Sequence, residues 1–94
     1  MLKNKEELIK QNIQKVINSW DPIGLMNICP EDEYEPEINE IVGFVISNKN
    51  KNKMSLSEEI RKIFNFYFTS IYNSINEVEE DVASKILEKC RNIL

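Results

Sequence analysis

The sequence predicts an all-α fold, a compact four-helix domain with a structured, proline-rich acidic connector between the first and second helices. Apolar residues recur at helical spacing in four separate segments. Glycine and proline are scarce, with 2 and 3 among 94 residues, and all three prolines fall within one short stretch. A chain of this length suits a single hydrophobic core, so residues 1–94 are expected to form one helical domain.

The first helix is predicted over residues 5–20. It is expected to end at Trp20, because Pro22 lacks a backbone N–H and moves the preceding Asp21 out of the right-handed helical region. Its apolar residues are spaced by three or four positions and therefore share one helical face. These residues are Ile9, Ile13, Val16, Ile17 and Trp20.

The segment WDPIGLMNICPEDEYEP, which starts at Trp20, is dense in turn formers and is predicted to be an ordered connector. Asp21 is expected to cap a short turn whose first residue is Pro22, and Gly24 to supply a positive φ. Tyr34 is expected to be a second aromatic anchor beside Trp20. These five residues form the predicted structural motif of the connector.

A second helix is predicted from Pro36, a favoured first helical residue, with Glu37 and Glu40 near its positive dipole end. A strand is the alternative, because the run IVGFVI is rich in β-branched residues. The spacing of the apolar residues favours the helix. They are Ile38, Ile41, Val42, Val45 and Ile46, and the polar run SNKNKNK at 47–53 follows them as a link.

Two further helices are predicted from their capping patterns. Ser55 with Glu58 is a capping box that opens the third helix, and Asn76 with Glu79 is expected to cap the fourth. The apolar face of the third helix is expected to hold Leu56, Ile60, Ile63, Phe64, Tyr67, Phe68, Ile71 and Ile75. That of the fourth is expected to hold Val78, Val82, Ala83, Ile86, Cys90 and Ile93.

Negative charge is concentrated in and beside the connector. No Lys or Arg lies between Lys15 and Lys49, whereas seven acids do: Asp21, Glu31, Asp32, Glu33, Glu35, Glu37 and Glu40. Elsewhere twelve basic residues face nine acids, so the rest of the chain is positive. The connector is therefore a solvated loop that keeps the protein soluble, a surface that attracts a basic protein, or a site for a divalent metal ion. Nucleic acid is not an expected partner, because its binding needs clustered Lys and Arg.

Few residues offer catalytic chemistry. The chain has no histidine, which removes the common nucleophilic triads, and neither a catalytic residue, a metal site nor a cofactor is predicted. The alternative is an all-α nucleotide phosphohydrolase that uses Mg²⁺ or Mn²⁺. Its carboxylates would be Glu37, Glu40, Glu77, Glu80 and Asp81, although acids are expected in the first turns of helices in any case.

The sequence favours a soluble cytoplasmic protein. The N-terminal residues lack the apolar run of a secretory signal, and the longest apolar stretch, Ile41–Ile46, falls far short of the ~20 residues that cross a bilayer. Cys29 and Cys90 are expected to be buried thiols in a reducing compartment. The chain is expected to be a monomer or a weak homodimer.

Phe66 lies opposite the apolar face of the predicted third helix. An aromatic residue in that position meets either another part of the chain or a second molecule.

The motif Trp20-Asp21-Pro22-Ile23-Gly24, followed by Asp32-Glu33-Tyr34-Glu35, resembles a family of small bacterial helical proteins of unknown function. The motif is also similar to short proteins that look like immunity or antitoxin partners. The stretch at 81–87 resembles the closing helix of that family. The resemblance implies an architecture but no activity.

We therefore expect a protein-binding module, an inhibitor or immunity-type partner of a basic protein, rather than an enzyme. The expected partner-binding residues are Asp21, Glu31, Asp32, Glu33, Tyr34, Glu35 and Phe66.

Overall fold

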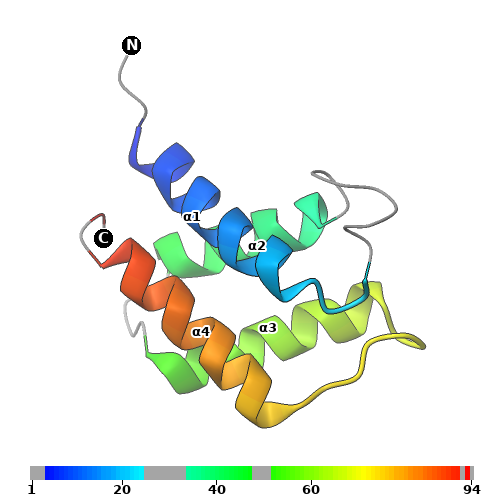
Figure 1. Ribbon diagram of the computed structural model, residues 1–94. Coiled ribbons are helices and arrows are strands. Elements are labelled where there is room, and N and C mark those ends of the chain that lie inside the picture. Colours follow the sequence, from blue (N-terminus) through cyan, green and yellow to red (C-terminus); the bar gives the residue numbers. More distant parts are fainter. Residues whose placement is uncertain (1–3, 25–33, 48–51, 92, 94) are drawn as a thin grey trace.

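A computed structural model describes residues 4–24, 34–47, 52–91 and 93 of the chain. It contains four helices, α1 (Lys5–Trp20), α2 (Glu35–Ser47), α3 (Lys53–Tyr67) and α4 (Asn76–Cys90) (Figure 1). The described ranges contain no strand, so the strand alternative for the second segment is wrong and the predicted all-α, four-helix fold is confirmed. None of these helices is long and apolar enough to cross a membrane.

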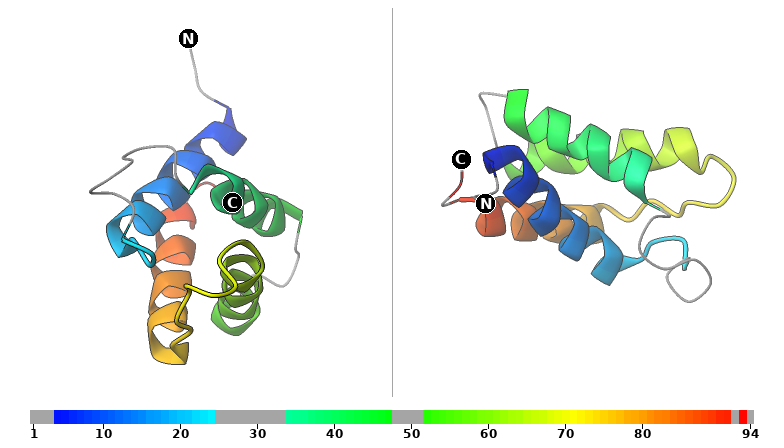
Figure 2. Two further views of the ribbon diagram at one scale, coloured as in Figure 1. Left: turned by 90° about the vertical axis from the view of Figure 1, so that its right-hand side faces the viewer. Right: turned by 90° about the horizontal axis from the view of Figure 1, so that it is seen from above.

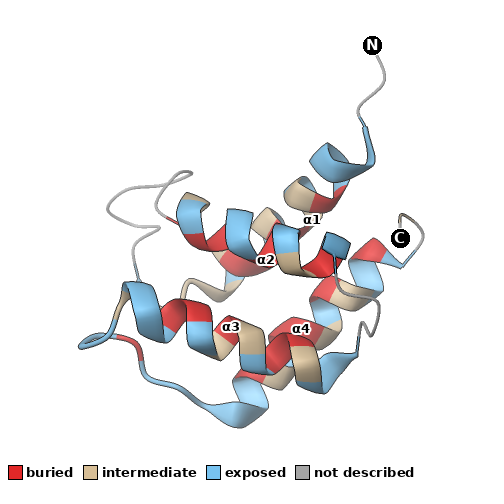
Figure 3. Cartoon of the chain, turned by 180° about the vertical axis from the view of Figure 1, so that it is seen from behind, coloured by how far each residue is buried: buried red, intermediate tan, exposed pale blue. Residues whose placement is uncertain are grey.

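The helices pack as a ring of four. α1 packs alongside α2 and α4, and α3 packs alongside the same two helices, whereas the backbones of the diagonal pairs do not approach each other closely. Figure 2 shows this arrangement in its left panel, with α1 and α2 above α4 and α3. The buried residues lie on the inward faces of all four helices and form one hydrophobic core (Figure 3).

An aromatic cluster lies at one end of this core, with the fully buried Phe64 at its centre. The Phe64 ring centroid lies 5.2 Å from that of Trp20, 5.6 Å from that of Tyr72, and 6.0 Å from those of Tyr34 and Phe68. Most of these pairs meet edge to face or at a tilt, and such contacts add to the stabilisation from area burial. The cluster therefore ties α1, the start of α2 and the end of α3 together.

Helix α1 has the predicted bounds. Asn4 caps its first turn by accepting a hydrogen bond from the backbone N–H of Glu7 at 2.8 Å. At the other end Asp21 leaves the right-handed helical region, as expected, but adopts a left-handed conformation with φ of 47°. Gly24 has the expected positive φ of 77°, and its N–H donates to the Asp21 carbonyl at 3.1 Å.

The rest of the connector up to residue 33 lies outside the described residues. That range contains Cys29 and the acids Glu31, Asp32 and Glu33.

Helix α2 begins at Glu35, one residue before the predicted start at Pro36. Four residues of its predicted apolar face are buried, but Ile46 is 43% exposed. Glu37 lies in the first turn of the helix, near its positive dipole end as expected, and its side chain is buried.

The predicted cap of α3 is wrong. Asn52, not Ser55, is the N-cap residue, and its side-chain oxygen accepts a hydrogen bond from the Ser55 N–H at 2.8 Å. The helix also ends at Tyr67, so Ile71 and Ile75 do not belong to its apolar face. These two side chains are 66% and 48% exposed, respectively.

The predicted cap of α4 is also wrong. Ile75 occupies the N-cap position and provides no side-chain hydrogen bond, whereas Asn76 is the first helical residue. The Glu79 side chain is buried rather than folded back over the helix end. Cys90 is a buried free thiol, as expected, and burial raises its pKa.

Candidate functional site

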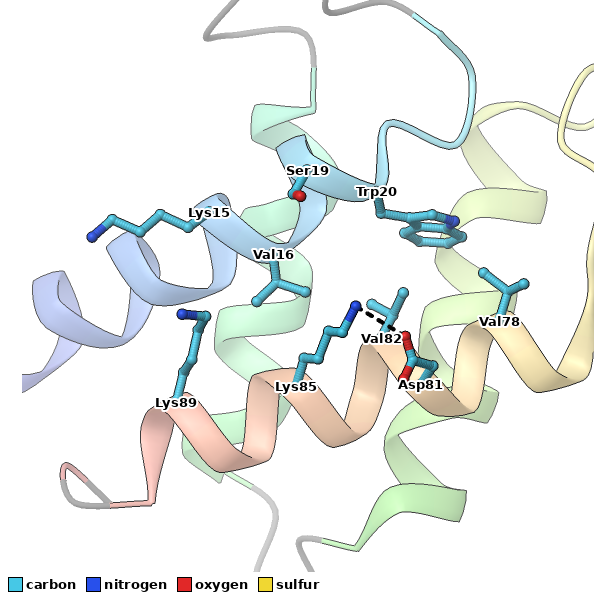
Figure 4. Close-up of a pocket in the computed structure, with 9 residues that line it drawn as sticks. All are labelled: Lys15, Val16, Ser19, Trp20, Val78, Asp81, Val82, Lys85 and Lys89. Carbon is cyan, nitrogen blue, oxygen red and sulfur yellow. Dashed lines mark ion pairs between the residues drawn. The ribbon is translucent and has the colours of Figure 1, made fainter.

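A groove of about 290 Å³ lies between α1 and α4 (Figure 4). On each helix the lining residues are neighbours or lie about one turn apart, and this spacing places their side chains on the same helical face. Helix α1 contributes Lys15, Val16, Ser19 and Trp20, and α4 contributes Val78, Asp81, Val82, Lys85 and Lys89.

The floor of the groove is apolar. Val16 and Val82 are both buried and belong to the hydrophobic core. Trp20 is half-buried at one end, where its ring lies beside Val78 (Figure 4). The Trp20 ring packs edge-on against Phe64 and against Tyr72, at a centroid distance of 6.0 Å from Tyr72. These contacts hold the indole in place without a ligand.

The rim of the groove is basic. Lys15 projects from α1, and Lys85 and Lys89 project from α4 (Figure 4). Lys85 forms an exposed ion pair with Asp81, with Nζ and Oδ2 3.1 Å apart. Lys15 and Lys89 form no ion pair with any residue that the structure describes. The ammonium groups of Lys15 and Lys89 are thus available to an anionic ligand. That of Lys85 becomes available if its exposed ion pair with Asp81, which contributes little stability, is broken.

A second hollow of about 270 Å³ continues on the far side of Trp20 and Val78, which line both depressions. The predicted motif residues Asp21 and Pro22 line it, together with Tyr72, Asn73 and Ile75. The turn after α1 therefore borders a surface that extends along α4.

Tyr34 was predicted to take part in partner binding, but its side chain is completely buried. Its hydroxyl donates a hydrogen bond to Asp21 Oδ1 at 2.7 Å and accepts one from the backbone N–H of Ile23 at 3.1 Å. Tyr34 thus fixes the turn after α1 from beneath. Of the predicted motif, Asp21 and Tyr34 are therefore in direct contact, and the tyrosine ring lies inside the core rather than at the surface.

Among the other predicted partner-binding residues, Glu35 and Phe66 are described by the structure and are at least partly exposed. Glu35 lies at the surface and pairs with Lys10, whose Nζ is 2.7 Å from Glu35 Oε1. Phe66 is 76% exposed, and among the described residues its ring contacts only that of its neighbour Tyr67. The acids at 31–33 lie outside the described ranges.

A buried carboxylate that sequence reasoning missed lies at the start of α4. Glu79 is fully buried and accepts hydrogen bonds from the Tyr72 hydroxyl, from Ser74 Oγ at 2.8 Å and from Arg61 Nε at 2.9 Å. Arg61 also donates to the Asn76 side chain. Burial, together with the bond to Glu79, raises the pKa of Tyr72, and the same carboxylate raises that of Arg61. The cluster fixes the α3–α4 loop, on which Tyr72 and Ile75 border the second hollow.

The family model for a domain of unknown function, DUF1871, matches residues 12–92. The chain belongs to this family. The match confirms the expected membership of a family of unknown function. It covers α2, α3 and α4 completely and α1 from residue 12 onwards, and it includes all the described residues that line the groove. No curated protein and no solved structure matches the chain significantly.

For this DUF1871 member, the metal-dependent phosphohydrolase alternative gains no support from the described residues. Its two carboxylate groups lie on α2 and α4, which are diagonal to each other in the ring and whose backbones do not approach closely. Of the α2 carboxylates, that of Glu37 is buried and that of Glu40 accepts a hydrogen bond from Tyr67. Within the described ranges no three Asp, Glu or Cys side chains converge as metal ligands do.

Replacing Tyr34→Phe is expected to lower the free energy of unfolding by about 1–2 kcal/mol. The change keeps the buried ring but removes the donor to Asp21 and the acceptor of the Ile23 N–H. Urea unfolding measures the loss. Tyr67→Phe is the matched control, since the Tyr67 hydroxyl bonds to Glu40 at the exposed surface, and it is expected to cost less than about 0.5 kcal/mol. Equal losses in the two variants would contradict the assigned role of Tyr34.

Proposed function

We propose that the protein is a cytoplasmic protein-binding module that acts by contact with another protein and not by catalysis. The observation that carries this proposal is the concentration of exposed apolar side chains between residues 66 and 78. Five of the eight large apolar residues that are exposed in the described ranges lie there: Phe66, Tyr67, Ile71, Ile75 and Val78. Exposed apolar surface that is gathered in one region is typical of protein interfaces.

Phe66 is the main anchor in this proposal. A largely exposed aromatic ring beside a second one, Tyr67, is the kind of side chain that dominates binding energy when a partner buries it. Ile75 and Val78 line the hollow next to Trp20, and Val78 also lines the groove between α1 and α4.

The more specific form of the proposal is an inhibitor or immunity-type partner of a basic protein. The described acids in this part of the chain are engaged or buried within the molecule: Asp21 bonds to Tyr34, Glu35 to Lys10 and Glu40 to Tyr67, and Glu37 is buried. Attraction of a basic partner then depends mainly on Glu31, Asp32 and Glu33. Reversing these three charges to Lys is expected to weaken capture of that partner and to remove its salt dependence.

Site-specific photocrosslinking in the native cells tests the binding function. A photoreactive amino acid at position 66 is expected to yield a discrete adduct that excess wild-type protein suppresses and excess Phe66→Ala protein does not. Position 62 is the matched control, since the Lys62 side chain is 76% exposed on the same helix, one turn earlier. The proposal would be contradicted by an absence of adducts at position 66, or by the same adducts at both positions.

A further inference from the structure

We propose that the groove between α1 and α4 binds an acidic peptide segment of the partner, with carboxylates beside Lys15, Lys85 and Lys89 and an apolar side chain against Trp20. This inference rests on the proposed function and deepens it by assigning the chemistry of one bound segment. Asp81 of α4 is the one acid among the described residues that line the groove, so the groove differs in charge from the acidic connector and would engage a different part of the partner (Figure 4).

Charge is the first argument for an acidic ligand. The groove is lined by three lysines and one aspartate, whereas the chain as a whole has a net charge of −4. The lysines come from two helices that are far apart in sequence, and Lys85 and Lys89 extend across the groove towards α1 (Figure 4). A local excess of positive charge, on a protein whose negative charge is concentrated in and beside the connector, favours an anionic segment over the rest of a partner's surface.

The apolar floor is the second argument, and it favours a peptide over a simple anion. A phosphate or a polyphosphate would contact the lysines but would leave Val78 and the exposed part of the Trp20 ring uncovered. A peptide that alternates acidic and aliphatic residues matches both parts of the groove. The volume of about 290 Å³ lies at the lower limit for a drug-sized ligand and suits side chains of a longer segment.

Nucleic acid matches the groove poorly. Phosphate contacts dominate nucleic-acid binding, and tight complexes neutralise several phosphates along the backbone. Three lysines at one short groove, one of them paired with Asp81, offer few such contacts.

Trp20 provides a direct readout, because it is the only tryptophan of the chain and lines the groove. We expect the peptide acetyl-Glu-Leu-Glu-Glu-Leu-Glu-amide to change the Trp20 emission saturably. Its affinity should fall by about tenfold when the ionic strength rises to about 0.3 M, as expected for exposed charges. The same peptide with Gln in place of Glu, a polyglutamate of equal length and a single-stranded oligonucleotide should each bind at least about tenfold more weakly.

The variant Lys15→Glu/Lys89→Glu is expected to lower the affinity for the acidic peptide by at least about tenfold. Its matched control is Lys5→Glu/Lys62→Glu, which changes the net charge equally at exposed lysines outside the groove and should bind as the wild type does. Lys15→Gln/Lys89→Gln repeats the test with a smaller change of charge, and circular dichroism verifies that each variant is folded.

Three results would overturn the inference: equal binding by the two Glu variants, equal affinity for the Gln peptide, or tighter binding of the oligonucleotide. None of these results affects the crosslink expected from position 66, so the groove and the binding function can fail separately.

Discussion

Replacing Phe64→Ala is expected to lower the free energy of unfolding by about 3–5 kcal/mol. Phe64 is fully buried, and its ring contacts four other aromatic rings that come from α1, from the start of α2 and from the segment after α3. Removing the ring loses this burial and leaves a cavity that four rigid neighbours cannot fill. Urea unfolding monitored by Trp20 emission measures the loss, since Trp20 is one of the four neighbours.

Phe66→Ala is the control for this change, because it removes the same side chain from the same helix two residues later. Phe66 is largely exposed, so its truncation is expected to alter the free energy of unfolding by no more than about 0.5 kcal/mol. Comparable losses in both variants would show that the aromatic cluster does not hold the fold together. In the proposed function the two residues have opposite roles, since Phe64 stabilises the domain and Phe66 binds the partner.

The helices themselves were predictable because burial in a four-helix ring follows the periodicity of the sequence. The five apolar residues predicted to share one face of α1 all face the core, and Pro22 sets the end of that helix through Asp21. Such signals act locally, within one turn. The turn from Asp21 to Gly24 was predictable because Pro22 and Gly24 act on the local backbone. The Tyr34 hydroxyl accepts a hydrogen bond from the Ile23 N–H of this turn.

Helix ends without such a signal were mispredicted. Both Asn52 and Ser55 are good capping residues, and the sequence does not reveal which of them adopts the extended backbone of an N-cap. No Gly or Pro follows Phe64 before residue 76, so the apolar pattern continues past the true end of α3 at Tyr67. The exposed Ile71 and Ile75 result from this early end, and they contribute to the proposed binding surface.

The groove could not be predicted because its residues meet only when α1 packs on α4. Lys15 lies about seventy positions from Lys85 and Lys89, so no window of the sequence shows a basic cluster. The acids of the connector, by contrast, lie close together in the sequence, and the predicted partner-binding residues were therefore mostly acids. In the structure several of them are engaged by side chains from other elements, such as Lys10 and Tyr67.

Glu79→Ala is expected to lower the free energy of unfolding by about 3 kcal/mol and the midpoint of thermal unfolding by more than about 10 °C. The buried carboxylate accepts hydrogen bonds from Tyr72, Ser74 and Arg61. Its removal leaves the Tyr72 hydroxyl buried without this acceptor, and a buried donor that loses its partner costs about 1–3 kcal/mol. Arg61 is partly exposed and can return to water, so the expected loss is at the lower end for a broken buried ion pair.

Glu77→Ala is the matched control, since Glu77 is an exposed acid in the same first turn of α4 and is expected to contribute less than about 1 kcal/mol through the helix dipole. A double-mutant cycle then separates the hydrogen bond from the packing of the ring. Tyr72→Phe should cost less in the Glu79→Ala background than in the wild type, because its hydroxyl no longer has the carboxylate as partner. Equal costs in the two backgrounds would mean that Tyr72 stabilises the loop through its ring alone, and that Glu79 acts on the fold through Arg61 and Ser74.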